Sequence, residues 1–174
     1  MSTSEARANP GSALCLRCGL CCTGEIFENV RLAEDEVEHA RSLRLPLLGE
    51  PTPHHFGLPC PAHRGGRCSV YTERPRACRS FVCLTLAALE AGDIDNAEAD
   101  RRVAKLREIA DRVRSGLPDE GRSLGLWAAV ARFSDEGENA DDGDEAWRVR
   151  HSAVLLDVLE LEHQCRRHFT ARGW

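Results

Sequence analysis

The pattern of apolar and polar positions divides the chain into a first half of short, irregular segments and a second half of helices. Residues 97–116 carry apolar side chains at helical spacing and end at Gly116, which is typical of a helix that packs one face on a core. Residues 123–133 predict a second, short helix. Residues 145–169 predict a longer one with a broad apolar stripe.

The first half predicts only short elements between turns. Residues 49–66 hold four Pro and four Gly, so long regular structure is not expected there. The remaining patterns predict a strand over 25–32, a helix over 33–45 that stops at Pro46, a hairpin that turns at Gly65–Gly66, and a helix over 80–92.

These patterns predict an α+β fold that is mostly α. We expect a small, irregular cysteine-rich module over 14–92, packed with C-terminal helices over 93–174. The length of 174 residues suits one compact domain. Residues 134–145 hold seven acidic side chains and no basic one, so we expect an acidic loop at about 134–146.

Charge and the N-terminal sequence narrow the function classes. The net charge of -5 and the absence of a basic stripe interleaved with aromatics argue against nucleic acid as a partner. The first 14 residues show no basic-then-apolar signal pattern, and no run approaches the ~20 apolar residues of a membrane helix. We therefore expect a cytoplasmic protein without a membrane partner.

Eight of the nine cysteines lie between residues 15 and 83. In a reducing compartment, clustered cysteines predict metal ligands more than disulfides. Eight thiolates would satisfy two four-coordinate metals, or one larger cluster with spare thiols. The alternative, eight buried free thiols acting as small apolar groups, is disfavoured because they cluster beside turns. The candidate metal ligands are Cys15, Cys18, Cys21, Cys22, Cys60, Cys68, Cys78 and Cys83.

The spacing of the first cysteines fits zinc and iron–sulfur equally. Two residues between Cys15 and Cys18 would let a tight turn point both sulfurs at one ion. With Cys21 they also match the first three ligands of bacterial ferredoxins, where a distant cysteine followed by proline often completes the set. Cys60, which precedes Pro61, is a candidate for that fourth position.

Cys21 and Cys22 are adjacent, and neighbouring residues of an extended chain point in opposite directions. We therefore expect the two thiols to serve different sites, or one to ligate while the other is a nearby or reactive thiol. A vicinal disulfide is disfavoured because it would be strained.

The residues between the later cysteines suggest a cofactor-binding role. Four thiolates around zinc carry net negative charge, which the guanidinium groups of Arg74 and Arg79 would offset while donating hydrogen bonds to sulfur. Pro75 would fix the turn before a helix that carries Cys78. Tyr71 would cover the site with its ring.

Histidines are weaker candidates. His63 lies three residues after Cys60, a spacing that zinc sites use, but loop packing is the better expectation for it and for the neighbouring His54 and His55. On the last helix we expect Cys165 to be a core thiol. The histidines near it, His151, His163 and His168, should line a polar edge.

One ordered string of residues resembles the CxxCxxCC cysteine-cluster proteins, also called YkgJ-like, which are described as zinc- or iron-chelating domains. The resemblance covers about residues 14 to 90 and implies metal chelation, with zinc and iron left open and no settled reaction. Some larger proteins with related clusters are thought to be enzymes or iron–sulfur proteins. The matching residues are Cys15, Cys18, Cys21, Cys22, Pro59, Cys60, Cys68, Tyr71, Arg74, Pro75, Cys78, Arg79, Phe81 and Cys83.

The sequence therefore predicts a metal-binding protein that chelates zinc or iron through eight cysteines, with the metal ion as its partner. An iron–sulfur protein in redox sensing or electron transfer is the first alternative. A metal- or thiol-dependent enzyme is the second, although the chain shows no HExxH motif, no phosphate-binding Gly loop and no Ser/His/Asp arrangement.

Overall fold

A computed structural model describes residues 10–49, 54–119, 124–139 and 143–170. Its helices and strands run α1 (Pro10–Cys18), α2 (Leu20–Thr23), β1 (Asn29–Arg31), η1 (Glu34–Glu36), α3 (Val37–Ser42), β2 (Leu47–Leu48), β3 (His55–Gly57), β4 (His63–Arg64), β5 (Arg67–Cys68), α4 (Arg76–Ser80), α5 (Leu84–Ala91), α6 (Asn96–Gly116), α7 (Leu126–Glu138), α8 (Asp144–Arg150) and α9 (Ser152–His168). With 62% helix and 8% strand, the predicted mostly-α α+β class is confirmed.

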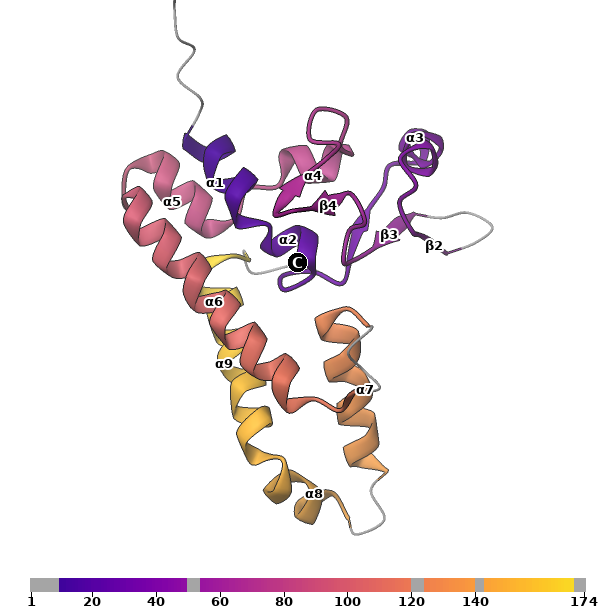
Figure 1. The fold of residues 1–174 in the computed structure, drawn as a ribbon, viewed down its shortest axis with the longest axis vertical. Coiled ribbons are helices and arrows are strands. Elements are labelled where there is room, and N and C mark those ends of the chain that lie inside the picture. The colour runs from indigo at the N-terminus through magenta and orange to yellow at the C-terminus, as the bar shows by residue number, and fades with distance from the viewer. Residues whose placement is uncertain (1–9, 50–53, 120–123, 140–142, 171–174) are drawn as a thin grey trace, which may run out of the picture.

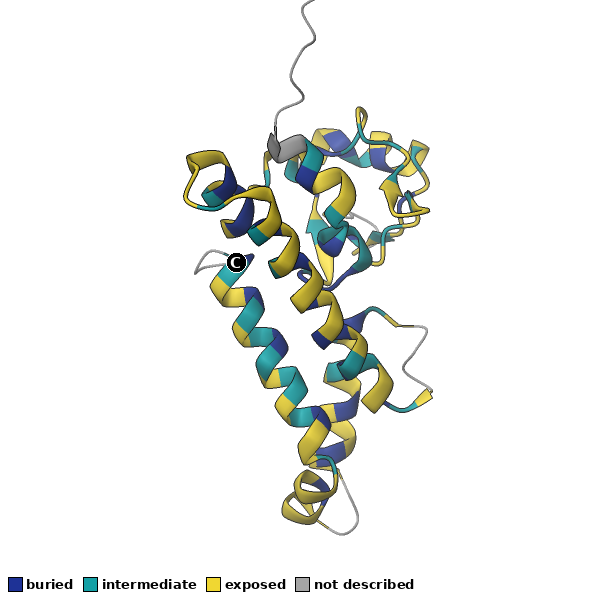
Figure 2. Ribbon diagram, turned by 60° about the vertical axis from the view of Figure 1, so that its left-hand side comes forward, coloured by how far each residue is buried: buried dark blue, intermediate teal, exposed yellow. Residues whose placement is uncertain are grey.

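Helices α6 and α9 pack side by side along the length of the molecule (Figure 1). The side chain of Asp95 accepts a hydrogen bond from Glu98 N at 2.7 Å and so begins α6, which ends at Gly116 as predicted. One face of α6 is buried and the opposite face is exposed (Figure 2). Helix α8 lies at the far end from the cysteine-rich elements, and α7 runs from beside them toward that end (Figure 1).

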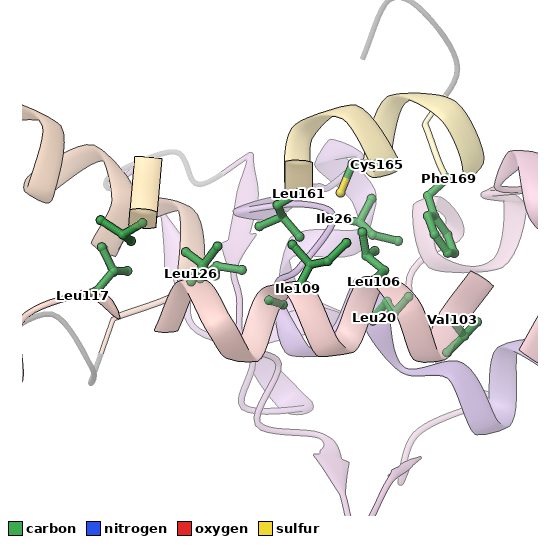
Figure 3. Packing of buried hydrophobic residues seen from close by; sticks show 14 of the residues in the cluster. Leu20, Ile26, Val103, Leu106, Ile109, Leu117, Leu126, Leu161, Cys165 and Phe169 are labelled. Atoms are coloured by element: carbon green, nitrogen blue, oxygen red, sulfur yellow. The ribbon is translucent and has the colours of Figure 1, made fainter. Parts of the chain in front are cut away.

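The larger hydrophobic cluster, here called the main core, joins these helices to the start of the chain. Leu20 of α2 and Ile26 lie beside Leu106 of α6 and Cys165 of α9 (Figure 3). Leu14 of α1 and Leu86 and Leu89 of α5 belong to the same cluster. The apolar faces of α1, α2 and α5 therefore share one core with the C-terminal helices.

A smaller hydrophobic cluster, here called the second core, lies under the three-stranded sheet. That sheet is antiparallel with the order β1-β3-β2, and Phe56 of β3 faces Val30 and Leu47 in register. The buried members of the second core are Leu32, Ala40, Leu45, Phe56 and Ala62.

A two-residue hairpin, β4–β5, follows the sheet. Arg64 pairs with Arg67, so the turn consists of Gly65 and Gly66, as the sequence predicts. Both glycines have positive φ, 55° and 75°, which the tight turn of a hairpin requires and which glycine adopts without a Cβ penalty.

Three predicted elements of the first half differ from the structure. The predicted strand over 25–32 is confined to Asn29–Arg31, because Ile26 packs on the main core and the buried Glu25 accepts a hydrogen bond from Arg114 of α6. The helix predicted over 33–45 is a 3₁₀ turn followed by the short α3. The helix predicted over 80–92 begins at Leu84, after α4, and ends at Gly92 as expected.

The predicted acidic loop is also wrong over most of its length. Helix α7 continues to Glu138 and α8 begins at Asp144, while residues 140–142 lie outside the described part of the chain. Gly137 allows α7 and α8 to pack closely, because a Cβ at this position would lie only 2.6 Å from Cε3 of the Trp147 ring. The single helix predicted over 145–169 is divided at His151, whose ring packs edge-on against Phe133. The division of the chain at residue 92 remains a prediction.

No helix in the described ranges has both the length and the apolar character needed to cross a membrane.

Candidate metal centre

The eight clustered cysteines sort into two sets of four by the charges they exert on one another. The first quartet is Cys15, Cys18, Cys21 and Cys83, and the second quartet is Cys22, Cys60, Cys68 and Cys78. Within each quartet, every pair of thiols is near enough for the charge of one to raise the pKa of the other. Between the quartets, the charges that act are those of Cys22 with Cys21 and with Cys18.

Three elements bring the first quartet together. Cys15 and Cys18 are three residues apart at the end of α1, so they share a face of that helix. The predicted tight turn is therefore wrong, since the spacing is helical. Cys21 lies on α2, and Cys83 stands before α5, where its Sγ accepts a hydrogen bond from Leu86 N at 3.3 Å. Cys15 is exposed and the other three are half-buried.

Burial is the main influence on these thiols. It raises the pKa of Cys18 to about 12 and that of Cys21 well above its ordinary value, with further increases from the charges of neighbouring cysteines. Without a bound cation, the first quartet therefore favours neutral thiols over thiolates.

The second quartet is assembled by hydrogen bonds of the backbone. Cys60 N donates to Cys22 O at 2.7 Å, which ties the loop after the sheet to α2. The β4–β5 hairpin pairs Cys68 with His63, and Pro75 precedes α4, which carries Cys78. Burial, with the charge of Cys60 next, raises the pKa of Cys22 to about 12 and that of Cys78 to about 11.

The adjacent pair divides between the quartets, although not for the reason the sequence suggests. Cys21 and Cys22 lie in the helical turn α2, where consecutive side chains diverge by about 100°, and not in extended backbone. After burial, the charge of Cys18 is the largest influence on the pKa of Cys21, and the charge of Cys60 is the largest on that of Cys22. Cys60, expected to complete the CxxCxxC set, instead accompanies Cys22, and Cys83 takes that fourth place.

Backbone N–H groups point at three of the sulfurs. Burial raises the pKa of Cys60 and Cys83, but hydrogen bonds from backbone N–H groups two or three residues later oppose that rise. Leu20 N–H does the same for Cys18. The donors are Leu20 for Cys18, Ala62 and His63 for Cys60, and Thr85 and Leu86 for Cys83. Such donors stabilise a thiolate more than a thiol, which suits a metal ligand.

Each quartet packs on a different core. Cys18, Cys21 and Cys83 contact the main core, whereas Cys60 and Cys78 contact the second core. The two quartets therefore lie at the junction of the two hydrophobic clusters.

Arg74 lies in the loop before α4, and its guanidinium carbon stands 3.6 Å from the centroid of the Tyr71 ring. Burial raises the pKa of Cys15 and that of Cys78, and the positive charge of Arg74 opposes part of this rise in both thiols. Arg74 therefore acts on one member of each quartet. Arg79, the other predicted cofactor-binding arginine, is exposed on the last turn of α4.

Two buried carboxylates, which the sequence analysis did not single out, hold the cysteine segments in place. Glu36 Oε1 accepts a hydrogen bond from Arg76 N at 2.7 Å and so anchors the start of α4. Glu25 Oε1 accepts from Arg114 of α6 at 3.1 Å, and its backbone oxygen accepts from Trp127 of α7 at 3.0 Å. A charged residue within an apolar segment was the only sequence signal for Glu25.

The C-terminal helices contact the first quartet directly through Arg107. Its Nη2 donates to the backbone oxygen of Cys18 at 2.7 Å, at the carboxyl end of α1. The ninth cysteine, Cys165, belongs to neither quartet and is a buried thiol of the main core, as expected.

Histidines take different positions. His63 lies on β4, and its Nε2 is buried without a hydrogen-bond partner among the described residues. A Cβ on Gly19 would lie 2.7 Å from that nitrogen, so the ring covers the short link between Cys18 and α2. The backbone oxygen of His54 accepts from Leu32 N at 2.6 Å beside the sheet, and His55 lies on β3. The contacts of His54 and His55 are therefore those of residues in or beside the sheet.

The donor set fits a thiophilic ion such as zinc or iron. Each quartet offers four thiols, with N–H donors on sulfur and a guanidinium nearby. In the described part of the chain, no three Cys, His, Asp or Glu side chains already stand at metal-ligating positions. The thiols of each quartet must therefore turn toward a common point to hold an ion.

Comparison with known proteins gives one result. A sequence model of the CxxCxxCC family, described as a candidate zinc- or iron-chelating domain, matches residues 14–105. The match includes both quartets and the first half of α6. No curated protein and no solved structure shows significant similarity to the chain.

Proposed function

Because the chain belongs to the CxxCxxCC family, whose description is metal chelation, we propose that it binds two metal ions, one in each quartet. The observation that carries this proposal is the division of eight thiols into two sets of four, with Cys21 in one set and Cys22 in the other. Four thiolates are a complete ligand set for tetrahedral zinc, at about 2.3 Å from sulfur to metal.

The raised pKa values support a dependence on the ion. Burial raises the pKa of Cys22 to about 12, so this thiol would stay protonated at neutral pH without a cation. A bound divalent ion supplies the positive charge that stabilises four thiolates. The backbone N–H groups near Cys60 and Cys83 are already oriented toward their sulfurs.

We propose that the ions have a structural role. The first quartet would join α1, α2 and α5 on the main core, and the second would join α2, the β4–β5 hairpin and α4 on the second core. Structural zinc contributes about 10–16 kcal/mol apparent in small zinc-dependent folds. The sheet and hairpin have short strands and a small core, so they have most to gain from such a contribution.

Counting the ions tests this proposal. We expect protein purified anaerobically to carry two zinc or two iron ions per chain, measured by elemental analysis and native mass spectrometry. Cys165→Ala is the matched control, because this cysteine lies outside both quartets. A loaded protein with one ion or none would overturn the two-site proposal.

An iron–sulfur cluster in the first quartet is the second candidate. Its support is the grouping of Cys15, Cys18 and Cys21 with the distant Cys83, which reproduces the order of ligands in ferredoxin-type clusters. Anaerobic protein would then absorb near ~400 nm and contain acid-labile sulfide. Colourless protein with stoichiometric zinc would exclude it.

All nine cysteines are free thiols, which supports the proposed cytoplasmic location.

A further inference from the structure

The imidazole of His63 is a candidate ligand that the second quartet does not include. Its Nε2, on the first strand of the β4–β5 hairpin, is buried and has no hydrogen-bond partner among the described residues. Buried polar atoms are nearly always paired with protein, water or an ion, so this nitrogen is expected to have a use. The neutral imidazole nitrogen of histidine is a common ligand of zinc.

A tight turn joins His63 to Cys60 of the second quartet. His63 N donates a hydrogen bond to Cys60 O at 3.0 Å and so closes a turn of four residues. The Cα atoms of the first and last residues of such a turn lie within about 7 Å of each other. The turn therefore presents a sulfur and an imidazole from one short loop, at a spacing that zinc sites use.

Two other members of the second quartet flank the same ring. Cys68 lies directly opposite His63 in the β4–β5 pair, so their Cβ atoms are about 4.5–5.5 Å apart on one face of the hairpin. A Cβ on Gly19 would lie 2.7 Å from His63 Nε2. Cys22 follows Gly19 by three residues in α2, and side chains of a helix tilt back toward its N-terminus. Nε2 therefore lies between the strand that carries Cys68 and the helical turn that carries Cys22.

We propose that His63 is a reserve ligand of the second quartet, whose Nε2 holds the ion in place of Cys68 when that thiolate is lost. This inference rests on the proposed binding of an ion by the second quartet. His63 and Cys68 belong to one hairpin and approach the ion from the same side. Cys22 and Cys78 come from α2 and α4, so His63 does not replace them. Exchange of a thiolate for a neutral imidazole changes the net charge of a zinc site from about -2 to about -1.

A double-mutant cycle in the full-length chain tests this role. Each variant also carries Cys21→Ser, which leaves only the second quartet complete, and is titrated anaerobically with Zn²⁺ against a competing chelator. In the Cys68→Ala background we expect His63→Leu to weaken Zn²⁺ binding by at least about tenfold, because the ion then loses its fourth ligand. With Cys68 present, His63→Leu should change the affinity by less than about threefold.

His55→Leu is the matched control, because His55 lies on β3, outside the hairpin. We expect it to change the affinity equally little in both backgrounds. An equal effect of His63→Leu in both backgrounds, large or small, would overturn the proposal, since a purely structural role of the ring does not depend on Cys68. Loss of all Zn²⁺ binding in Cys68→Ala would also overturn it.

A second measurement keeps the proposal testable if the Cys21→Ser chains do not fold. The same variants are then compared with Cys21 present, by the share of chains that keep two ions against the chelator in native mass spectrometry. We expect this share to be lower in Cys68→Ala with His63→Leu than in Cys68→Ala alone. Equal shares would overturn the proposal.

The two proposals fail in different ways. If the original chain takes up fewer than two Zn²⁺ ions, the proposed function is wrong. If the original chain binds two ions and the effect of His63→Leu does not depend on Cys68, only the role of His63 is wrong.

Discussion

At the scale of single residues, the site depends on a few backbone and charge positions beside the cysteines. Gly19 separates Cys18 from α2 with a φ of 67°, a conformation that glycine adopts readily and other residues rarely do. The His63 ring occupies the space that a Cβ on Gly19 would need. The spacing CxxCxxCC therefore requires a residue without a side chain at this position.

Gly19→Ala is expected to destabilise the protein. The positive φ alone costs about 1–2 kcal/mol, and a Cβ 2.7 Å from His63 Nε2 would also displace that ring. Urea unfolding followed by circular dichroism would measure the change. Gly65→Ala is a useful comparison, because its φ is also positive but no atom lies within 4 Å of its Cβ position. Equal losses in both variants would show that the His63 contact contributes nothing.

Cys165 makes stability depend on pH. Burial, with the charge of Glu25 next, raises the pKa of this thiol from 9.0 to about 12. Because the folded pKa is the higher one, the contribution to stability is complete below pH 9 and is lost as pH rises toward 12. We expect the free energy of unfolding to fall between pH 8 and pH 10 by about 1 kcal/mol more in the original chain than in Cys165→Ala. Parallel pH profiles would contradict this.

At the scale of elements, α2 is the shared part of the two quartets. Its four residues carry Cys21 and Cys22, and Leu20 buries the turn in the main core. The loop from α4 to α5 has the same function at the other end, because it separates Cys78 of the second quartet from Cys83 of the first. The segment from α2 and the segment from α4 to α5 therefore each contribute one thiol to the first quartet and another to the second.

Substitution of the adjacent cysteines should separate the two sites. We expect Cys21→Ser and Cys22→Ser each to reduce two bound ions to one, because each variant leaves three thiolates in one quartet and four in the other. Hydrogen exchange should then increase in α1 and α5 for Cys21→Ser, but in the β4–β5 hairpin and α4 for Cys22→Ser. The same exchange pattern in both variants would mean that the quartets form one site.

Some elements could be predicted from the sequence and others could not. Helix α6 and the Gly65–Gly66 turn follow from local patterns, since periodicity and positive φ act within a few residues. Helices α1 and α2 were missed because cysteine and glycine have weak helix propensity, and here packing of Leu14 and Leu20 on the main core outweighs it. Strands β2 and β3, which have two and three residues, carry too little pattern to detect.

At the scale of the whole molecule, we expect the two cores to differ in their dependence on the proposed metal ions. The main core contains α6, α7, α8 and α9 and extends well beyond the first quartet, whereas the second core is a small cluster beside the second quartet. Glu25 and Arg107 connect the cysteine segment to the helices without any ion.

Removal of metal by a chelator under reducing conditions should therefore affect the halves differently. We expect hydrogen exchange to rise strongly in the three-stranded sheet, α3 and the β4–β5 hairpin, while α6 and α9 keep most of their protection. Circular dichroism should retain most of its helical signal. Retained protection in the sheet and hairpin would show that the second core is stable without its ion.

The sequence by itself determined the donor set, the mostly-α composition and the likeness to a metal-chelating family, because residue identity and spacing along the chain carry that information. Only the tertiary structure decided which thiols belong together. Cys83 is 62 residues beyond Cys21, and Cys60 is brought to Cys22 by a backbone hydrogen bond of 2.7 Å. Such pairings depend on how the loops close over two separate cores, and no local pattern records that closure.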